Sequence, residues 1–242
     1  MKTIGLIGGM SWESTAVYYR RLNESARAAR GGLASARVLL HSLDFSDVVA
    51  LQKAGRWDLA AEMLAASARG LEAAGADCVL ICTNTMHLVA DAVASSIEVP
   101  LIDVVAETGR EIVGAGLRRP LLLATRYTME HGFYADRMER LAGLRPIVPE
   151  AEDRAEVHRI IFEELCVGRV EERSHRAMLS IVERGRAAGA DSVILGCTEI
   201  CLLLDPDALV LPGFDSTRIH ADAASRFALH ETDIQLRERK AA

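Results

Sequence analysis

The chain contains 242 residues, of which 50% are hydrophobic, 26% are charged and 5% are aromatic. This supplies enough apolar material for one large domain or for two smaller ones. The net charge of −6 leaves no basic face for nucleic acid, and no apolar run reaches the roughly 18 residues of a membrane span. Five cysteines without a secretion signal predict reduced thiols in the cytoplasm.

Short apolar runs alternate with helical stretches along the chain, a pattern that predicts an α/β fold with mainly parallel sheets. The apolar runs resemble strands that are buried on both faces. Residues 58–74 and 173–188 show helical spacing and are rich in Ala, Arg and Glu. The expected strands, in chain order, are TIGLIGG, ARVLLHSLD, DCVLICT, VPLIDVV, RPLLLAT, SVILGCT and ALVLPGF.

A Gly-Gly turn at Gly8 and Gly9 follows the first expected strand. Such a turn lets the main chain approach a ligand closely, and Ser11 is expected to cap the next helix. GLIGGM lacks the G-x-G-x-x-G spacing of a dinucleotide site, and the chain has neither a Walker A lysine motif nor a CxxC or HExxH metal motif. We therefore expect no metal and no cofactor.

The stretch LICTNTMH ends an apolar strand on Cys82 and continues directly with three small polar residues. Thr83, Asn84 and Thr85, together with the loop amides, could bind a carboxylate. The same surroundings are expected to lower the pKa of the Cys82 thiol. The alternative is a buried, space-filling cysteine followed by an ordinary helix cap.

The chain also contains an internal repeat. AAGAD at residues 73–77 precedes the first cysteine motif, and AAGAD at residues 187–191 precedes SVILGCTEI, 114 positions later. The two strand-end cysteines, Cys82 and Cys197, lie 115 positions apart, and LIGGMSWESTAVYY aligns loosely with LLATRYTMEHGFY. We expect two similar α/β halves, with chance similarity of helix ends as the alternative.

The second cysteine motif places Thr198 and Glu199 directly after Cys197. Gly196 permits a close approach of the backbone, and Thr198 is expected to cap the following helix. Glu199 could orient a substrate ammonium or accept a proton; alternatively, it is an ordinary acidic residue in a first helical turn. Because matching positions of both repeats carry a cysteine, packing alone explains the pair poorly.

Ligands of open α/β sheets bind beyond the carboxyl ends of the strands. If the two halves face each other about a pseudo-twofold axis, both cysteines point into one cleft from opposite sides. We expect residues 1–103 and 212–230 to form a discontinuous N-terminal lobe, residues 104–211 the second lobe, and residues 231–242 a polar tail.

Two opposed thiols suit a reaction that inverts a carbon centre. A thiolate removes a proton from one face of a tetrahedral carbon, and a thiol delivers a proton to the other face. The carbanion that forms between these steps requires preorganised hydrogen-bond donors. The candidate donors are Thr83, Asn84, Thr85, Thr125 and Thr198.

The segments GLIGGMSWEST, CTNTMH, TRYTME, HRIIFEEL and GCTEI together resemble the aspartate/glutamate racemase family, the cofactor-independent amino-acid racemases. The resemblance runs over about residues 1–228. It implies two flavodoxin-like lobes with the active site in the cleft between them, a frequent homodimer, and a two-base mechanism in which Cys82 and Cys197 serve the two enantiomers. The substrate-pocket residues that it implies are Met10, Gln52, Thr83, Asn84, Thr85, Thr125 and, for a side-chain carboxylate, Arg126.

Glu199 stands where the glutamate racemases of cell-wall synthesis typically carry histidine, which favours the aspartate type or a broad specificity. A neutral or longer amino-acid substrate stays open. The alternatives are a related carbanion enzyme (hydantoin racemase, maleate isomerase or arylmalonate decarboxylase), an inactive amino-acid-binding protein, and a thiol redox protein. The expected partners are a small amino acid and a second copy of the chain, without nucleic acid or membrane.

Overall fold

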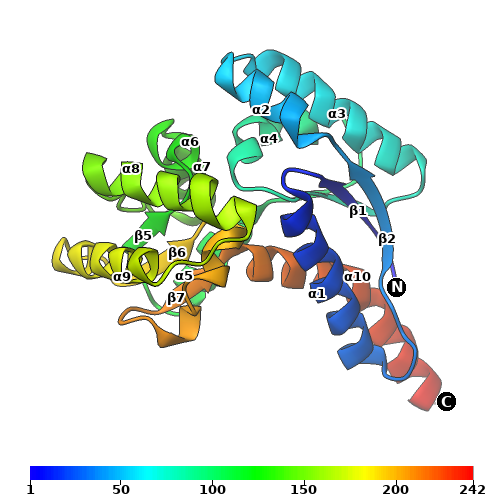
Figure 1. The fold of residues 1–242 in the computed structure, drawn as a ribbon. Helices are drawn as coiled ribbons and strands as arrows, with labels where there is room; N and C mark the ends of the chain where they lie inside the picture. The colour runs from blue at the N-terminus through cyan, green and yellow to red at the C-terminus, as the bar shows by residue number, and fades with distance from the viewer. Residues whose placement is uncertain (242) are drawn as a thin grey trace. The chain divides into compact units, whose positions relative to one another are not determined.

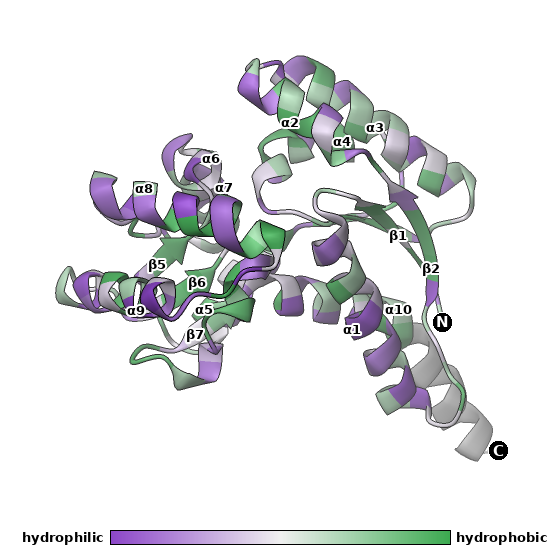
Figure 2. Ribbon diagram, viewed as in Figure 1, coloured by the Kyte–Doolittle hydropathy of each residue, from purple (hydrophilic) through white to green (hydrophobic). Residues whose placement is uncertain are grey.

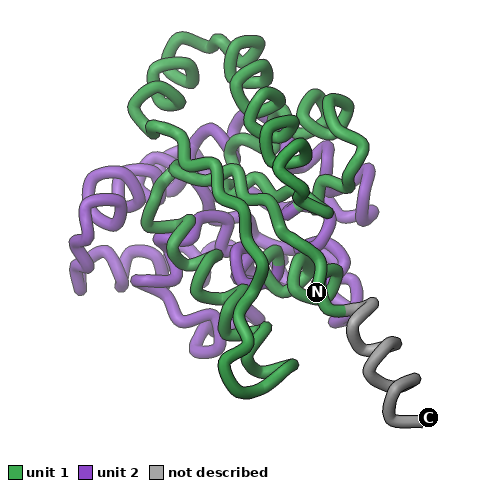
Figure 3. The backbone as a smooth tube through the Cα atoms, turned by 90° about the vertical axis from the view of Figure 1, so that its right-hand side faces the viewer, with its two compact units in different colours: residues 1–103, 220–242 green, residues 104–219 purple. Residues whose placement is uncertain are grey.

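The computed structural model describes the backbone of residues 1–241 and the side chains of residues 1–229. Two compact units make up the chain (Figure 3): residues 1–103 with 220–242 form unit 1, and residues 104–219 form unit 2. The chain re-enters unit 1 at His220, later than the residue 212 expected from the sequence, because residues 213–215 still pair with the sheet of unit 2. The side chains of the expected tail, residues 231–242, lie outside the described residues.

Unit 1 is built on a four-stranded parallel sheet in the order β2-β1-β3-β4. Figure 1 labels two of these strands, β1 and β2. All residues of β1 and β3 are buried, as expected for central parallel strands. β2 is partly or fully exposed along its length, so the expectation of burial on both faces is wrong there, because β2 forms an edge of the sheet. The strands are β1 (Thr3–Gly8), β2 (Arg37–Ser42), β3 (Cys78–Ile81) and β4 (Leu101–Ile102).

Alternating residues of the central strands point to opposite faces of this sheet. Ile4 and Leu80 pack on one face with residues of α1 and α10, whereas Ile7 and Ile81 pack on the other with residues of α3 and α4. Helices therefore cover both faces of the sheet. The helices are α1 (Trp12–Arg30), α2 (Phe45–Lys53), α3 (Trp57–Ala73), the 3₁₀ helix η1 (Thr85–Val89), α4 (Ala90–Ala94) and α10 (Ser216–Ala241).

Unit 2 repeats this arrangement on a smaller scale. Its parallel strands are β5 (Pro120–Leu123), β6 (Ser192–Leu195) and β7 (Gly213–Asp215), in the order β5-β6-β7, and a parallel bridge joins Leu121 to Ile147. β5 and β6 occupy the places that β1 and β3 occupy in unit 1. The expected α/β class with parallel sheets is confirmed.

The helices of unit 2 carry hydrophilic residues on their outer sides, while β5 and β6 are hydrophobic (Figure 2). One continuous apolar core, which includes Leu122, Ile160 and Ile194, lies against the sheet. The helical elements are α5 (Val104–Gly114), α6 (Arg126–Glu130), α7 (Phe133–Ala142), α8 (Ala151–Arg159), the π-helical turn η2 (Ile160–Glu164), α9 (Glu172–Ala187) and the 3₁₀ turns η3 (Leu165–Val167), η4 (Thr198–Leu202) and η5 (Pro206–Ala208).

Sequence patterns located most of these elements, but the last expected strand differs. The run ALVLPGF predicted a strand that begins at Ala208, whereas β7 begins at Gly213, after a turn that contains Pro206. In the described part of the chain, none of the helices is both long and apolar enough to cross a membrane.

Candidate active site

The turn after β1 brings small groups close together. Gly9 has a φ of +82°, and a Cβ atom there would lie 2.2 Å from the carbonyl oxygen of Leu43, so only glycine fits. Its amide donates to Thr15 Oγ1 at 2.9 Å. Ser11 caps α1 by accepting the amide of Ser14 at 3.2 Å, as expected from the sequence.

Cys82 follows β3 directly, beside the end of β1. Its amide donates to the carbonyl oxygen of Ile7 at 3.0 Å, and its own carbonyl accepts from Ser14 Oγ at 3.4 Å. The residue is 0% exposed, and this burial raises the pKa of the Cys82 thiol far above its ordinary value. The expectation of a lowered pKa is therefore wrong, because the thiol lies in an apolar core, beside Leu80 and Ala221.

The polar residues after Cys82 form a compact loop. Asn84 and Thr85 are buried, and Thr85 begins η1. His87 Nδ1 lies 2.8 Å from the carbonyl oxygen of Thr83; since a carbonyl only accepts, Nδ1 carries the proton. His87 thus supports the loop, although the sequence analysis did not single it out; its place four residues after Thr83, in the same motif, was the available signal.

A second buried histidine lies against the first. His220 Nε2 donates to the carbonyl oxygen of Ile102 at 2.7 Å, so its Nδ1 accepts from the Tyr18 hydroxyl at 2.9 Å. The rings of His87 and His220 meet edge to face, with centroids 5.8 Å apart. Burial lowers the pKa of His220 to about 3, so this histidine is neutral.

The two other candidates of unit 1 lie in its core. Met10 is 5% exposed and Gln52 is 7% exposed. Gln52 Nε2 donates to Met86 Sδ at 3.2 Å, and Met10 and Met86 belong to one apolar cluster. Met86 is part of η1, which follows the Cys82 loop, so both candidates pack near that loop.

Cys197 occupies the corresponding place in unit 2, after β6. The amide of Gly196 donates to the carbonyl oxygen of Leu123 at 2.8 Å, and a Cβ atom on Gly196 would lie 3.0 Å from Ala124 Cβ. The Cys197 thiol donates to Glu199 Oε2 at 2.8 Å. Burial first, and then the negative charge of Glu199, raise the pKa of the Cys197 thiol well above its ordinary value.

Thr198 does not cap the next helix, contrary to expectation. It is the first residue of η4, and Cys197 stands at the capping position instead. The Thr198 hydroxyl lies 2.9 Å from the hydroxyl of Thr217, so these side chains share a hydrogen bond. Thr217, which lies at the start of α10, is not predictable from the sequence, because nothing local links it to the cysteine motif.

Thr125 and Arg126 follow β5, the neighbour of β6. Thr125 caps α6, accepting the amide of Thr128 at 3.5 Å. Arg126 begins α6 and is exposed. Because β5 and β6 are parallel neighbours, these residues lie at the same edge of the sheet as Cys197.

A family model described as Asp/Glu/Hydantoin racemase matches residues 7–224. The chain belongs to the Asp/Glu/hydantoin racemase family. The structure is similar to that of a candidate Asp/Glu racemase from Yersinia pestis, with 45% identity and a TM-score of 0.90 over 95% of this chain and 100% of that one. It is also similar to an aspartate racemase homologue from Pyrococcus horikoshii, with 34% identity and a TM-score of 0.83 over 94% and 99%.

The fold extends to more distant racemases. An aspartate racemase from Picrophilus torridus shares it at 18% identity, with a TM-score of 0.74 over 94% of each chain. In the present chain, the described residues contain no group of three or more His, Cys, Asp or Glu side chains that could hold a metal ion. The candidate residues gather at the carboxyl ends of the inner strands: Met10, Cys82, Thr83, Asn84 and Thr85 in unit 1, and Thr125, Arg126, Cys197, Thr198 and Glu199 in unit 2.

Proposed function

We propose that the protein is an amino-acid racemase, independent of pyridoxal phosphate, of the aspartate/glutamate type or of broader specificity. Cys82 and Cys197 act on opposite faces of the substrate α-carbon. The observation that carries this proposal is the repeated arrangement of the two units, each of which places a thiol just after its second inner strand, β3 or β6. Membership of the racemase family supports the reaction class.

The chemistry requires one thiolate and one thiol. Raised thiol pKa values make each thiolate, once formed, a stronger base than that of an ordinary cysteine. Glu199 lies 2.8 Å from Cys197 Sγ and takes its proton. The Cys197 thiolate then removes the α-proton, and the Cys82 thiol protonates the opposite face of the carbanion; the reverse reaction exchanges these roles.

The remaining candidates bind the substrate in this proposal. Hydroxyl, amide and backbone N–H donors stabilise the carboxylate as negative charge develops on it. Because Cys82 is fully enclosed, catalysis also requires that substrate binding uncovers its thiol. The proposed donors are Thr83, Asn84, Thr85, Thr125 and Thr198; Met10 and Gln52 contact the substrate, and Arg126 is the candidate for a side-chain carboxylate.

We further propose a cytoplasmic homodimer. None of the five cysteines, all of which are described, forms a disulfide. The outer face of α1 exposes Trp12 by 67% and Tyr19 by 55%, seven residues apart and therefore on one side of the helix. Changing both residues to Glu should convert a dimer to a monomer in light scattering; a wild-type monomer would contradict this part of the proposal.

The reaction is tested by α-proton exchange in D₂O, followed by NMR with single L- and D-amino acids, and by chiral chromatography of the products. Wild-type protein should exchange the α-proton and invert the configuration, whereas Cys82→Ala and Cys197→Ala should not invert it. The absence of exchange with every amino acid would overturn the racemase proposal and leave a related carbanion enzyme or an amino-acid-binding protein.

A further inference from the structure

A row of partly buried side chains in unit 2 leads from α6 to Cys197. The rings of Tyr127 and His158 lie with centroids 6.4 Å apart, and those of His158 and Phe162 lie 4.6 Å apart. One turn further, Cys166 lies in η3, and η3 contacts η4, which begins directly after Cys197. Phe162, Cys166 and Cys197 pack on the same apolar core. Aromatic and apolar groups therefore form a wall beside the proposed catalytic thiol.

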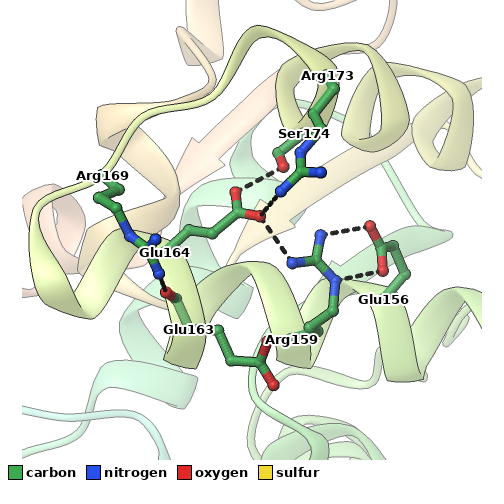
Figure 4. Close-up of polar contacts among 7 residues, drawn as sticks. All are labelled: Glu156, Arg159, Glu163, Glu164, Arg169, Arg173 and Ser174. Carbon is green, nitrogen blue, oxygen red and sulfur yellow. Dashed lines mark hydrogen bonds and ion pairs between the residues drawn. The ribbon is translucent and has the colours of Figure 1, made fainter.

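A buried carboxylate, that of Glu164, holds the backbone of the wall in place. Glu164 has only 3% of its side chain exposed; it accepts from Ser174 Oγ at 2.6 Å and from Arg159 at 2.7 Å, and Arg173 lies 3.6 Å away (Figure 4). These bonds hold the π-helical turn that carries Phe162 and Glu164. Such turns are frequent at functional sites, and this one links His158 to Cys166.

The same network occupies three cations that lie close in sequence to Phe162 and Glu164. Arg159 is shared between Glu156, at 2.7 Å, and Glu164 (Figure 4). Arg173 also faces Glu164, and Arg169 donates to the backbone carbonyl of Glu163. A substrate carboxylate that approached these guanidinium groups would have to displace a carboxylate or a carbonyl that already binds them.

His158 adds no positive charge to the wall. The amide of Arg126 donates to His158 Nδ1 at 3.3 Å, so this nitrogen is an acceptor and the ring is neutral in this arrangement. Burial, followed by the charge of Arg126, lowers the pKa of His158. The surface that Tyr127, His158 and Phe162 present is therefore uncharged.

We propose that this wall is the side-chain subsite of the enzyme, and that it selects amino acids with a large uncharged side chain, such as phenylalanine or methionine, over aspartate and glutamate. The inference rests on the proposed racemase function and narrows it to the broad-specificity branch. Aromatic rings offer apolar area and edge or face contacts to such a side chain. A substrate side-chain carboxylate at the wall could pair with Arg126. Arg159, Arg169 and Arg173 already bind a carboxylate or a carbonyl.

The test compares kcat/KM for racemisation of phenylalanine, methionine, alanine, aspartate and glutamate by wild type and Phe162→Ala. We expect phenylalanine and methionine to exceed aspartate and glutamate in wild type. Phe162→Ala should lower kcat/KM for the two large substrates by at least about tenfold, and for alanine, which does not reach the wall, by less than about twofold. Phe133→Ala is the matched control, because Phe133 packs on the same core outside the wall.

Two further variants, Phe162→Leu and Arg126→Ala, distinguish a misfolded protein and a carboxylate-binding site from the proposed subsite. Phe162→Leu restores apolar volume and should recover part of the methionine activity if Phe162→Ala folds poorly. Preferred turnover of aspartate or glutamate, abolished by Arg126→Ala, would overturn the subsite while leaving the racemase proposal intact. An equal loss for all five substrates in Phe162→Ala but not in Phe133→Ala would also overturn it. Failure to exchange any amino acid would overturn both proposals.

Discussion

The loops that follow β3 and β6 begin alike and end in different electrostatic surroundings. Cys82 is fully enclosed in the apolar core of unit 1, whereas Cys197 is partly exposed and its thiol donates a hydrogen bond to Glu199. Two positions after each cysteine the chain has Asn84 in one loop and Glu199 in the other. A repeated fold thus fixes where a thiol stands, while its neighbours decide which group it hydrogen-bonds.

The two loops also rest on different supports. In unit 1, His87 holds the carbonyl of Thr83 and packs against the neutral His220. In unit 2, the hydroxyl pair of Thr198 and Thr217 holds the start of η4. Only the first support contains imidazole rings, whose protonation would break these contacts, so acid should weaken the Cys82 loop before it affects the hydroxyl pair.

Replacing either thiol is expected to have the largest effect on the reaction. Cys82→Ala and Cys197→Ala should each reduce inversion about 10³-fold, because each variant lacks one of the two proton-transfer groups. The remaining thiol should still exchange the α-proton of one enantiomer, and the two variants should exchange opposite enantiomers. NMR in D₂O with pure L- and D-substrates measures this. Exchange of the same enantiomer by both variants would contradict the division of roles.

The histidine support predicts that the stability of unit 1 depends on pH. The folded pKa of His220, about 3, lies below its unfolded value near 6.5. The unfolded state therefore binds a proton first as the pH falls, and stability is lost from about pH 6.5 towards 3. Between pH 7 and pH 5 this amounts to about 2 kcal/mol, which His220→Gln should abolish.

Urea unfolding followed by tryptophan fluorescence measures this effect selectively, because both tryptophans, Trp12 and Trp57, belong to unit 1. The wild-type midpoint should fall between pH 7 and pH 5 by more than the midpoint of His220→Gln. Equal shifts in the two proteins would show that His220 does not cause the loss.

The Glu199 contact gives a smaller effect on rate and a clear effect on the thiol pKa. Glu199→Gln should lower kcat/KM for inversion about tenfold. The loss should be equal for the two enantiomers, because the equilibrium constant of racemisation is one. Removing the carboxylate should also shift the pKa of Cys197 downward, because its charge helps to raise that pKa. Iodoacetamide labelling of Cys197 against pH, resolved by peptide mass spectrometry, measures the shift, which wild-type protein labelled under the same conditions calibrates.

The hydroxyl pair gives the smallest effect. Thr217→Val keeps the branched shape of the side chain and removes its hydrogen bond to Thr198, which should destabilise the Cys197 loop by about 1 kcal/mol. Amide hydrogen exchange in η4 should accelerate about fivefold, while exchange in η1 of unit 1 stays unchanged. Unchanged exchange in η4 would show that the hydroxyl pair does not hold that loop.

Sequence patterns predicted the architecture well because apolar runs and helical spacing are local properties. The seven expected strand regions, the helices at residues 58–74 and 173–188, and the repeat of the two cysteine motifs follow from such patterns. Errors arose where the position in the sheet decided the outcome. β2 is exposed because it lies at an edge, and β7 starts late because it has to pair with β6.

The sequence indicated the candidate residues one by one, but it did not indicate the groups that support them in the structure. Cys82, Cys197 and their polar neighbours stand out as strand-end motifs. His220 lies 133 positions beyond His87, and Thr217 lies 19 positions beyond Thr198. No local pattern connects such pairs, because they meet only after α10 has packed against the strands.

The sequence by itself therefore determined two α/β units and the placement of a cysteine at the end of an inner strand in each, since strand periodicity and repeated motifs encode both. Only the tertiary structure decided the proton affinities of these thiols. Burial raises both pKa values, contrary to what a polar loop suggests, and of these two thiols Glu199 acts only on Cys197. The physical reason is that desolvation depends on what packs around a group in space, which residues far along the chain supply.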